Sequence, residues 1–425
     1  MLSKLYHDKF VRHNAIVLVG SFTAAFLNYL VHPVLGRLMT VQEFGEFQAL
    51  LQIYNNLMFM GVFGTIVMNI TANTDPTDEQ AAQENREVIS VLNKVALVIS
   101  STVALAILLG SGLLRDFFHF DSIWPFVMLV PAPIIAMHGV FRRAYLRAKL
   151  HFTDWTMSSV YTALARLFIA AVLVFIGWGA FGAITGVVGA MFVGYAFVYL
   201  RSRKTFSYVR GVKIKLSPRL KREIQYGFLI LSVSLVNTAM STADVLVVKR
   251  YFDPIIAGEY SAVATIARII LYAAGPVAIV LSPNIKLRQS VQENRAVLRK
   301  SIWLMSFVAG SGLLIFVLWP EFVLKLLMGS QFNQAAYLLP HLAIFMTLVT
   351  MSGIFFAYHL ALRHYFIFLV GLAGLGTALA LSVVYHPSLS AIVNNFIAGT
   401  VLMLLIFAVR WIRRLFFFPN NVTVE

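Results

Sequence analysis

The sequence predicts an all-α polytopic membrane protein, with about twelve transmembrane helices in two pseudo-symmetric six-helix lobes around a central cavity. Three observations lead to this fold class. The 425 residues are 59% hydrophobic and only 12% charged, whereas a soluble protein is about one-quarter charged. Apolar windows long enough to cross a bilayer recur along the whole chain, and landmarks of the first half return in the second.

The apolar windows define the expected helices. About twenty apolar residues are needed to cross a hydrocarbon core of roughly 30 Å. We expect spans at residues 13–36, 45–69, 91–113, 122–141, 155–178, 180–200, 225–248, 257–281, 301–319, 335–359, 365–385 and 389–410. No long polar stretch remains between them for a soluble domain.

The internal repeat defines the lobes. Gly45-Glu46-Phe47 recurs as Gly258-Glu259-Tyr260, at an offset of 213 in the numbering. Leu146-x-x-Lys149-x-x-Phe152 returns as Leu360-x-x-Arg363-x-x-Phe366 at an offset of 214, and Thr162-Ala-Leu-Ala165 as Thr377-Ala-Leu-Ala380 at 215. Duplicated hydrophobic halves are typical of secondary transporters, with the substrate site where the halves meet. We expect an N-terminal lobe, a basic cytoplasmic linker and a C-terminal lobe at residues 1–200, 201–222 and 223–425.

The net charge of +16 is an orientation signal rather than a nucleic-acid signal. With a cytoplasmic N-terminus, 27 basic residues fall in inside segments and five in outside loops. By the positive-inside rule, both termini are then expected in the cytoplasm. The chain has no cysteine, which excludes disulfides and thiolate metal sites, and we expect neither a metal nor a cofactor.

Two basic residues, Arg166 and Arg268, are expected near the middle of spans. An arginine at mid-bilayer costs about 2.5–3.5 kcal/mol on insertion scales, so each needs a wet or anionic environment or a polar partner. Two readings stay open for each arginine, substrate contact and structural pairing, and Asp244 is the candidate partner.

Polar residues at helical spacing accompany these arginines. Ser261, Thr265, Arg268 and Tyr272 lie on one helix face, and the repeat offset of 213 relates this face to a second polar face in the first half. We expect these faces to converge on a central chamber. The candidate substrate-binding residues are Arg268, Arg166, Asn55, Gln52, Gln48, Asn28, Thr265 and Ser241.

Arginine is well suited to a diphosphate, because its planar fork donates two parallel hydrogen bonds and stays charged. A wet cationic chamber open to lipid would hold a phosphorylated headgroup while the acyl or prenyl tail stays in the bilayer. Asp244 has two readings: a proton or cation site that couples transport, or a structural ion pair with Arg250 or Lys249.

A family resemblance rests on two motifs. Leu35-Gly-Arg-Leu-x-x-x-x-Glu43-Phe-Gly-Glu-Phe47 and Leu326-Leu-Met-Gly-Ser-x-Phe332-x-x-Ala335 resemble segments of the polysaccharide (O-antigen type) lipid-carrier flippases. These belong to the multidrug/oligosaccharidyl-lipid/polysaccharide exporter superfamily. The number of spans, the two halves and the basic linker extend the likeness over the whole chain.

The resemblance implies a flippase and not an enzyme. Its cargo would be an undecaprenyl-diphosphate-linked oligosaccharide, moved by alternating access to the outer leaflet of the bacterial inner membrane. Expected partners are that lipid-linked oligosaccharide, membrane lipids, and a polysaccharide polymerase or chain-length machinery, with no nucleic acid. The alternative is a cation-coupled exporter of drugs or small amphiphiles, which would depend on Asp244.

Overall fold

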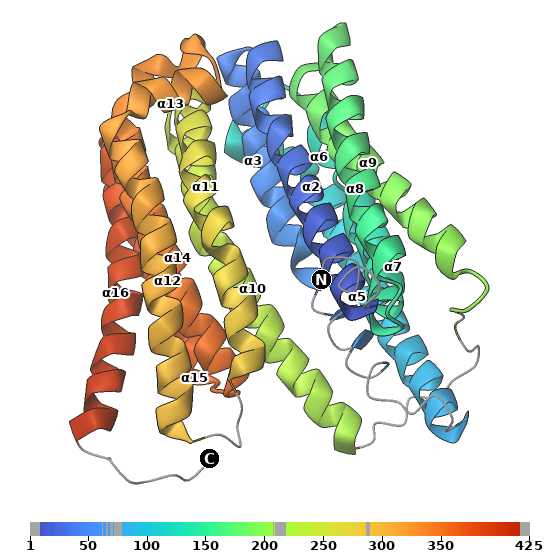
Figure 1. The fold of residues 1–425 in the computed structure, drawn as a ribbon. Helices are drawn as coiled ribbons and strands as arrows, with labels where there is room; N and C mark the ends of the chain where they lie inside the picture. Colours follow the sequence, from blue (N-terminus) through green and yellow to red (C-terminus); the bar gives the residue numbers. More distant parts are fainter. Residues whose placement is uncertain are drawn as a thin grey trace, which may run out of the picture. The chain divides into compact units, whose positions relative to one another are not determined.

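A computed structural model describes residues 9–61, 63–64, 67–68, 71, 79–206, 208, 218–285 and 290–416. The chain forms two compact units, residues 1–231 and 232–425. Every regular element in the described ranges is a helix, as Figure 1 shows. The predicted all-α class is confirmed.

Unit 1 is built from helices that pack mainly in pairs. α8 and α9 form a hairpin, α2 packs against α8, and α7 packs against both α5 and α9. Its elements are α2 (Lys9–Leu38), α3 (Val41–Leu57), η1 (Met58–Gly61), α5 (Glu79–Phe118), α6 (Trp124–Val127), α7 (Pro131–Ala148), α8 (Phe152–Leu173), η2 (Val174–Trp178) and α9 (Gly179–Ser202). α10 (Pro218–Tyr251) begins in this unit and continues into the next.

Unit 2 is organised around α14, which packs against α11, α12 and α16, while α15 packs against α16. These helices can be followed from yellow to red in Figure 1. The elements after α10 are α11 (Pro254–Asn284), α12 (Val291–Leu318), α13 (Pro320–Leu327), η3 (Ser330–Leu338), α14 (Leu339–Ala361), α15 (Phe366–Val384) and α16 (Leu389–Phe416).

Ten helical stretches in the described residues are long and apolar enough to cross a bilayer. They account for eleven of the twelve expected spans, because the 51-residue stretch Phe152–Ser202 contains two of them. The remaining span, 45–69, lies partly outside the described residues. The chain is therefore a multi-pass membrane protein.

Several helices extend beyond their apolar windows. α5 begins at Glu79 and α12 at Val291, whereas the expected spans begin at 91 and 301. The difference arises because hydropathy detects only the apolar part of a helix and not its polar ends. The polar start of α12 is set by a capping box, in which Ser290 and Glu293 satisfy each other's backbone N–H groups. Much of the expected linker, residues 207 and 209–217, lies outside the described residues.

The two halves share backbone details at the same offset. Thr40 caps α3 in a capping box with Glu43. Its equivalent, Asp253, accepts a hydrogen bond from the Ile255 N–H at the start of α11 (2.9 Å). The preceding turns agree as well, since the Met39 N–H donates to the Leu35 carbonyl and the Phe252 N–H to the Val248 carbonyl. The internal repeat is therefore present in the backbone.

The turn that follows α7 repeats after α14 and corrects one alignment. The Leu150 N–H donates to the Arg147 carbonyl (3.1 Å), and the Arg363 N–H donates to the Leu360 carbonyl (3.0 Å). Leu150 and Arg363 both have positive φ, at 60° and 55°. These equivalent positions keep the offset of 213, so the side-chain match at an offset of 214 pairs neighbouring positions of this turn rather than equivalent ones.

Close helix packing in unit 1 depends on a glycine in α9. A Cβ added to Gly186 would lie 2.5 Å from the backbone nitrogen of Ala170 in α8. Backbone cannot rotate away as a flexible side chain can, so any larger residue must separate the two helices.

We therefore expect Gly186→Ala to lower the melting temperature of the detergent-solubilised protein, with an overpacking cost of about 1–3 kcal/mol. Gly112→Ala in α5 is the matched control, because a Cβ there meets nothing within 4 Å. The control should leave the melting temperature unchanged or raise it, since alanine favours helix by about 1 kcal/mol over glycine. Equal effects of the two substitutions would contradict the packing argument.

Candidate functional site

The centre of unit 2 holds a buried ion pair between α10 and α11. Arg268 donates from Nη2 to Asp244 Oδ1 (2.8 Å) and from Nε to the Ser241 carbonyl (2.9 Å). The hydroxyl of Tyr260 donates to the other carboxylate oxygen, Asp244 Oδ2 (3.0 Å). The side chains of Arg268 and Asp244 are 3% and 0% exposed.

In this structure Arg268 forms the kind of contact expected for structural pairing, the second of the two roles considered from the sequence. Asp244 is the expected partner of Arg268, and its carboxylate is bound by Arg268 and Tyr260 rather than presented to an open chamber. Nη1 of Arg268 is buried without a hydrogen-bond partner among the described residues. One face of this guanidinium therefore retains unused donor capacity.

The other predicted site residues of unit 2 donate their hydroxyl hydrogen bonds to backbone carbonyls of their own helices. The Thr265 hydroxyl donates to the Ser261 carbonyl (2.8 Å). The Ser241 hydroxyl donates to the Thr238 carbonyl (2.9 Å). Both side chains are buried, and these hydrogen bonds satisfy their hydroxyl groups within their own helices.

The predicted polar residues of α2 and α3 form short local networks. Gln48 lies 2.9 Å from the Nδ1 of His32. Asn55 donates to Gln52 Oε1 (3.2 Å), and Asn28 donates to the Ala24 carbonyl (2.8 Å). Gln48 and Gln52 are buried, whereas Asn28 and Asn55 are half-buried.

Arg166 in α8 has a much weaker environment than Arg268. Its Nη2 lies 3.5 Å from the Tyr54 hydroxyl, at the limit of a hydrogen bond, and its guanidinium carbon lies 5.8 Å from the centre of the Tyr54 ring. Its Nε is buried without a hydrogen-bond partner among the described residues. Arg166 is half-buried, so part of the residue stays accessible.

A second arginine, Arg143, is one of the 27 basic residues expected in inside segments, and it lies on the neighbouring helix α7. α7 runs to Ala148, and Arg143 in its last turns donates from Nη2 to the Thr162 hydroxyl (3.0 Å). Thr162 and Arg166 are one turn apart on the same face of α8, and the two guanidiniums are close enough to interact electrostatically. The signal that sequence reasoning missed was the length of α7, which the apolar window ends at 141.

Neither Arg143 nor Arg166 has an acidic partner within 4 Å in the part of the chain that the structure describes. Two half-buried, unpaired cations on neighbouring transmembrane helices are costly unless an anion or water reaches them. We name Arg143, Arg166, Tyr54 and Thr162 the cationic cluster of unit 1.

The neighbouring Arg142 is a buried arginine held by a hydroxyl and aromatic rings, with no carboxylate within 4 Å among the described residues. Arg142 is buried, donates to the Ser202 hydroxyl (2.8 Å), and lies over the rings of Tyr199 and Phe206, at 4.6 and 5.2 Å. It is enclosed on both sides by aromatic groups. In the described part of the chain, Arg166 has one such ring contact, the distant one with Tyr54.

Comparisons with known proteins give a family. The model of the polysaccharide biosynthesis protein family matches residues 10–287, more than half of the chain. The chain belongs to this family. The resemblance to the lipid-carrier flippases is thereby confirmed.

Solved structures share the fold over nearly the whole chain. The lipid II flippase MurJ, in an inward closed conformation, is 14% identical, with a TM-score of 0.67, covering 93% of this chain and 87% of its own. An inward-facing multidrug resistance MATE family transporter of the MOP superfamily is 13% identical, with a TM-score of 0.66, covering 91% of this chain and 94% of its own. No curated protein matches the sequence.

A MOP superfamily transporter from Pyrococcus furiosus is 14% identical, with a TM-score of 0.57, and covers 95% of this chain and 94% of its own. At these identities the likeness shows the fold alone. Membership of the polysaccharide biosynthesis protein family therefore rests on the family match, and these structures add that the fold is shared. Among the described residues, no group of three His, Asp or Glu side chains is arranged to hold a metal ion.

The ion pair of unit 2 can be tested by substitution. Removing one partner of a buried pair leaves a lone charge and costs about 3–5 kcal/mol. Arg268→Gln should therefore lower the melting temperature strongly, and the double variant Asp244→Asn/Arg268→Gln should recover most of the loss. Arg147→Gln, which removes an exposed arginine at the end of α7, is the control and should have little effect. A single Arg268→Gln variant as stable as the parent would contradict the assignment.

Proposed function

We propose that the protein is a flippase for an undecaprenyl-diphosphate-linked oligosaccharide, such as an O-antigen or another surface polysaccharide unit. In this proposal the cargo moves from the cytoplasmic to the outer leaflet of the bacterial inner membrane by alternating access, with both termini in the cytoplasm. Its partners would be the lipid-linked oligosaccharide, membrane lipids, and a polymerase or chain-length machinery.

The observation that carries the proposal is the unpaired charge of the cationic cluster. Arg143 and Arg166 are half-buried in a membrane unit without a carboxylate within 4 Å among the described residues. A diphosphate supplies the missing negative charge and enough acceptor oxygens for two guanidiniums. Family membership and the fold shared with the lipid II flippase MurJ support the same class of cargo.

Arg268 is among the cargo contacts expected from the sequence, but we propose Arg166 together with Arg143 for that role. Arg268 is bound to Asp244 and to the Ser241 carbonyl, whereas the nearest partner of Arg166 is a tyrosine hydroxyl at 3.5 Å. A phosphate can therefore bind Arg166 without breaking an ion pair, whereas binding to Arg268 would compete with Asp244.

A cation-coupled exporter of drugs or small amphiphiles is the second candidate, because a multidrug MATE transporter shares the fold and Asp244 is an acid inside a membrane helix. Two observations disfavour it. The charge of Asp244 is already balanced by Arg268, and the cationic cluster would repel a positively charged drug.

Transport in proteoliposomes separates the two functions. With a fluorescent undecaprenyl-diphosphate disaccharide as probe, Arg166→Gln and Arg143→Gln should each slow protein-dependent flipping by about tenfold to a hundredfold. This is the rate equivalent of a lost charged hydrogen bond, about 1.5–3 kcal/mol. Arg166→Lys keeps the charge but loses the fork, so an intermediate rate is expected.

Stability and a control variant make this test specific. Arg166→Gln should leave the melting temperature almost unchanged, because it removes only the long contact with Tyr54, and Arg147→Gln should flip the probe at the parental rate. Parental flipping by the Arg143→Gln/Arg166→Gln double variant would reject the cationic cluster as the cargo site. Efflux of a cationic dye that is lost in Asp244→Asn, without any flipping, would establish the exporter instead.

A further inference from the structure

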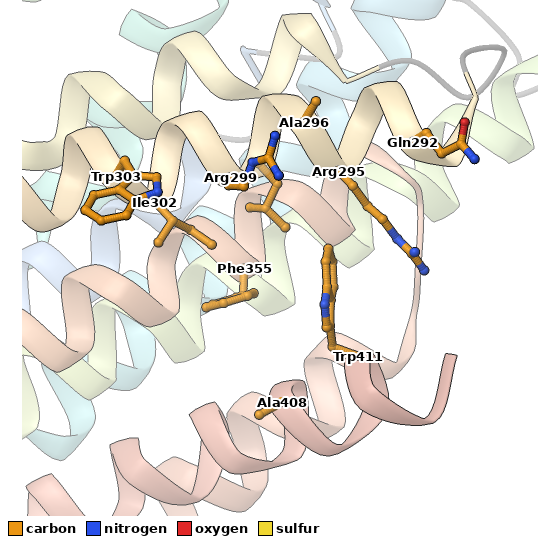
Figure 2. A pocket seen from close by; sticks show the side chains of 10 residues that line it. Gln292, Arg295, Ala296, Arg299, Ile302, Trp303, Phe355, Ala408 and Trp411 are labelled. Atoms are coloured by element: carbon orange, nitrogen blue, oxygen red, sulfur yellow. The ribbon is translucent and has the colours of Figure 1, made fainter. Parts of the chain in front are cut away.

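A second cationic site lies in unit 2, in a pocket between α12, α14 and α16. The cavity has a volume of about 690 Å³, a size typical of pockets for small ligands. Figure 2 shows side chains from the three helices converging on it. It is lined by Gln292, Arg295, Ala296, Leu298, Arg299, Ile302, Trp303, Phe355, Ala408 and Trp411.

The lining changes from polar to apolar along α12. Gln292, Arg295 and Arg299 form the polar end, near the helix start at Val291. Their spacing places them on one face of the helix, and Ile302 continues that face one turn further on. Gln292 and Ile302 are separated by about 15 Å along the helix axis. The pocket therefore has a charged end and an apolar end, which match the headgroup and the hydrocarbon chain of an amphiphile.

The charge in the pocket is uncompensated by its lining. All ten lining residues lack a carboxylate, and the two charged ones are arginines. The Arg295 guanidinium carbon lies 5.1 Å from the centre of the Trp411 ring, and Figure 2 shows the two side chains next to each other. Stacking on an aromatic face orients a guanidinium and leaves its edge donors for an anion.

Large apolar side chains next to the pocket are exposed on the surface of α12, which suits contact with lipid. Trp303, Leu304 and Phe307 of α12 are 74%, 54% and 75% exposed, as expected for side chains in contact with acyl chains in a membrane protein. Tryptophan is enriched at the headgroup level. By the positive-inside rule, this basic end of α12 is expected at the cytoplasmic surface, where anionic lipids are found.

We propose that this pocket binds the headgroup of an anionic phospholipid, with Arg295 and Arg299 on the phosphate and the apolar end against the first methylenes of an acyl chain. The site shares no residue with the cationic cluster, and the inference holds whatever the transported cargo is. Its occupant is a membrane lipid, bound on the lipid-facing side of unit 2.

Native mass spectrometry of the delipidated full-length protein tests the proposal. Titration with dioleoylphosphatidylglycerol should show one site tighter than any for dioleoylphosphatidylcholine. Each arginine near an anionic surface strengthens binding roughly fivefold, so Arg295→Gln/Arg299→Gln should weaken this site about thirtyfold. Arg147→Gln/Lys149→Gln is the matched control, because Arg147 lies over Trp155 at 5.2 Å, a similar pair that is not part of the pocket. This control should bind like the parent.

A second readout places the lipid. Brominated phosphatidylglycerol should quench the fluorescence of Trp303 and Trp411, and the Trp303→Phe/Trp411→Phe variant should lose that component. Ala408→Phe fills the pocket without removing charge, and it should also abolish the tight site. This variant tests the proposal if the arginine variant fails to fold.

Three results would overturn the assignment. The first is equal binding of the two phospholipids to the parent protein. The second is equal loss of binding in the pocket and control variants. The third is displacement of the lipid by millimolar sodium phosphate, which would show that the pocket takes free phosphate.

Discussion

Charge that enters a low-dielectric membrane unit must be neutralised, and the two units meet this constraint in different ways. Unit 2 balances Arg268 with Asp244 and adds the Tyr260 hydroxyl to the second carboxylate oxygen. Unit 1 leaves Arg143 and Arg166 with hydroxyl groups alone. The buried charge of Arg268 is therefore balanced within unit 2, whereas Arg143 and Arg166 gain most from an anion brought from outside. The division of labour between structure and binding follows from this difference.

Duplication explains why the asymmetry is informative. Helix starts and turn hydrogen bonds recur at one constant offset. The fold that the two halves share therefore does not depend on the arginines inside the membrane. Shifted by the same offset, Arg143 corresponds to Phe356 and Arg268 to Asn55. Arg143 and Arg268 are thus each present in one half alone, and of these two Arg143 lacks a carboxylate within 4 Å in the described residues.

Much of the fold could be predicted because membrane insertion imposes a strong and simple pattern. Apolar windows located the helices, and the repeat located two related halves. Helix ends were less predictable, because polar capping residues such as Ser290 extend a helix beyond the part that suits lipid. The same limit hid Arg143. Arg143 lies two positions beyond an apolar window, so the sequence places it in a loop. Because the helix continues, Arg143 instead donates a hydrogen bond to Thr162.

The role of Arg268 could not be settled from the sequence, because its pairing with Asp244 depends on the rotation of two helices about their own axes. The left-handed turn after α7 and α14 adds a different lesson. Leu150 and Arg363 share nothing as side chains, yet both accept a backbone conformation that L-residues avoid. What the two copies preserved through divergence is a pattern of peptide hydrogen bonds, so homology in this protein is better traced through main-chain geometry than through residue identity.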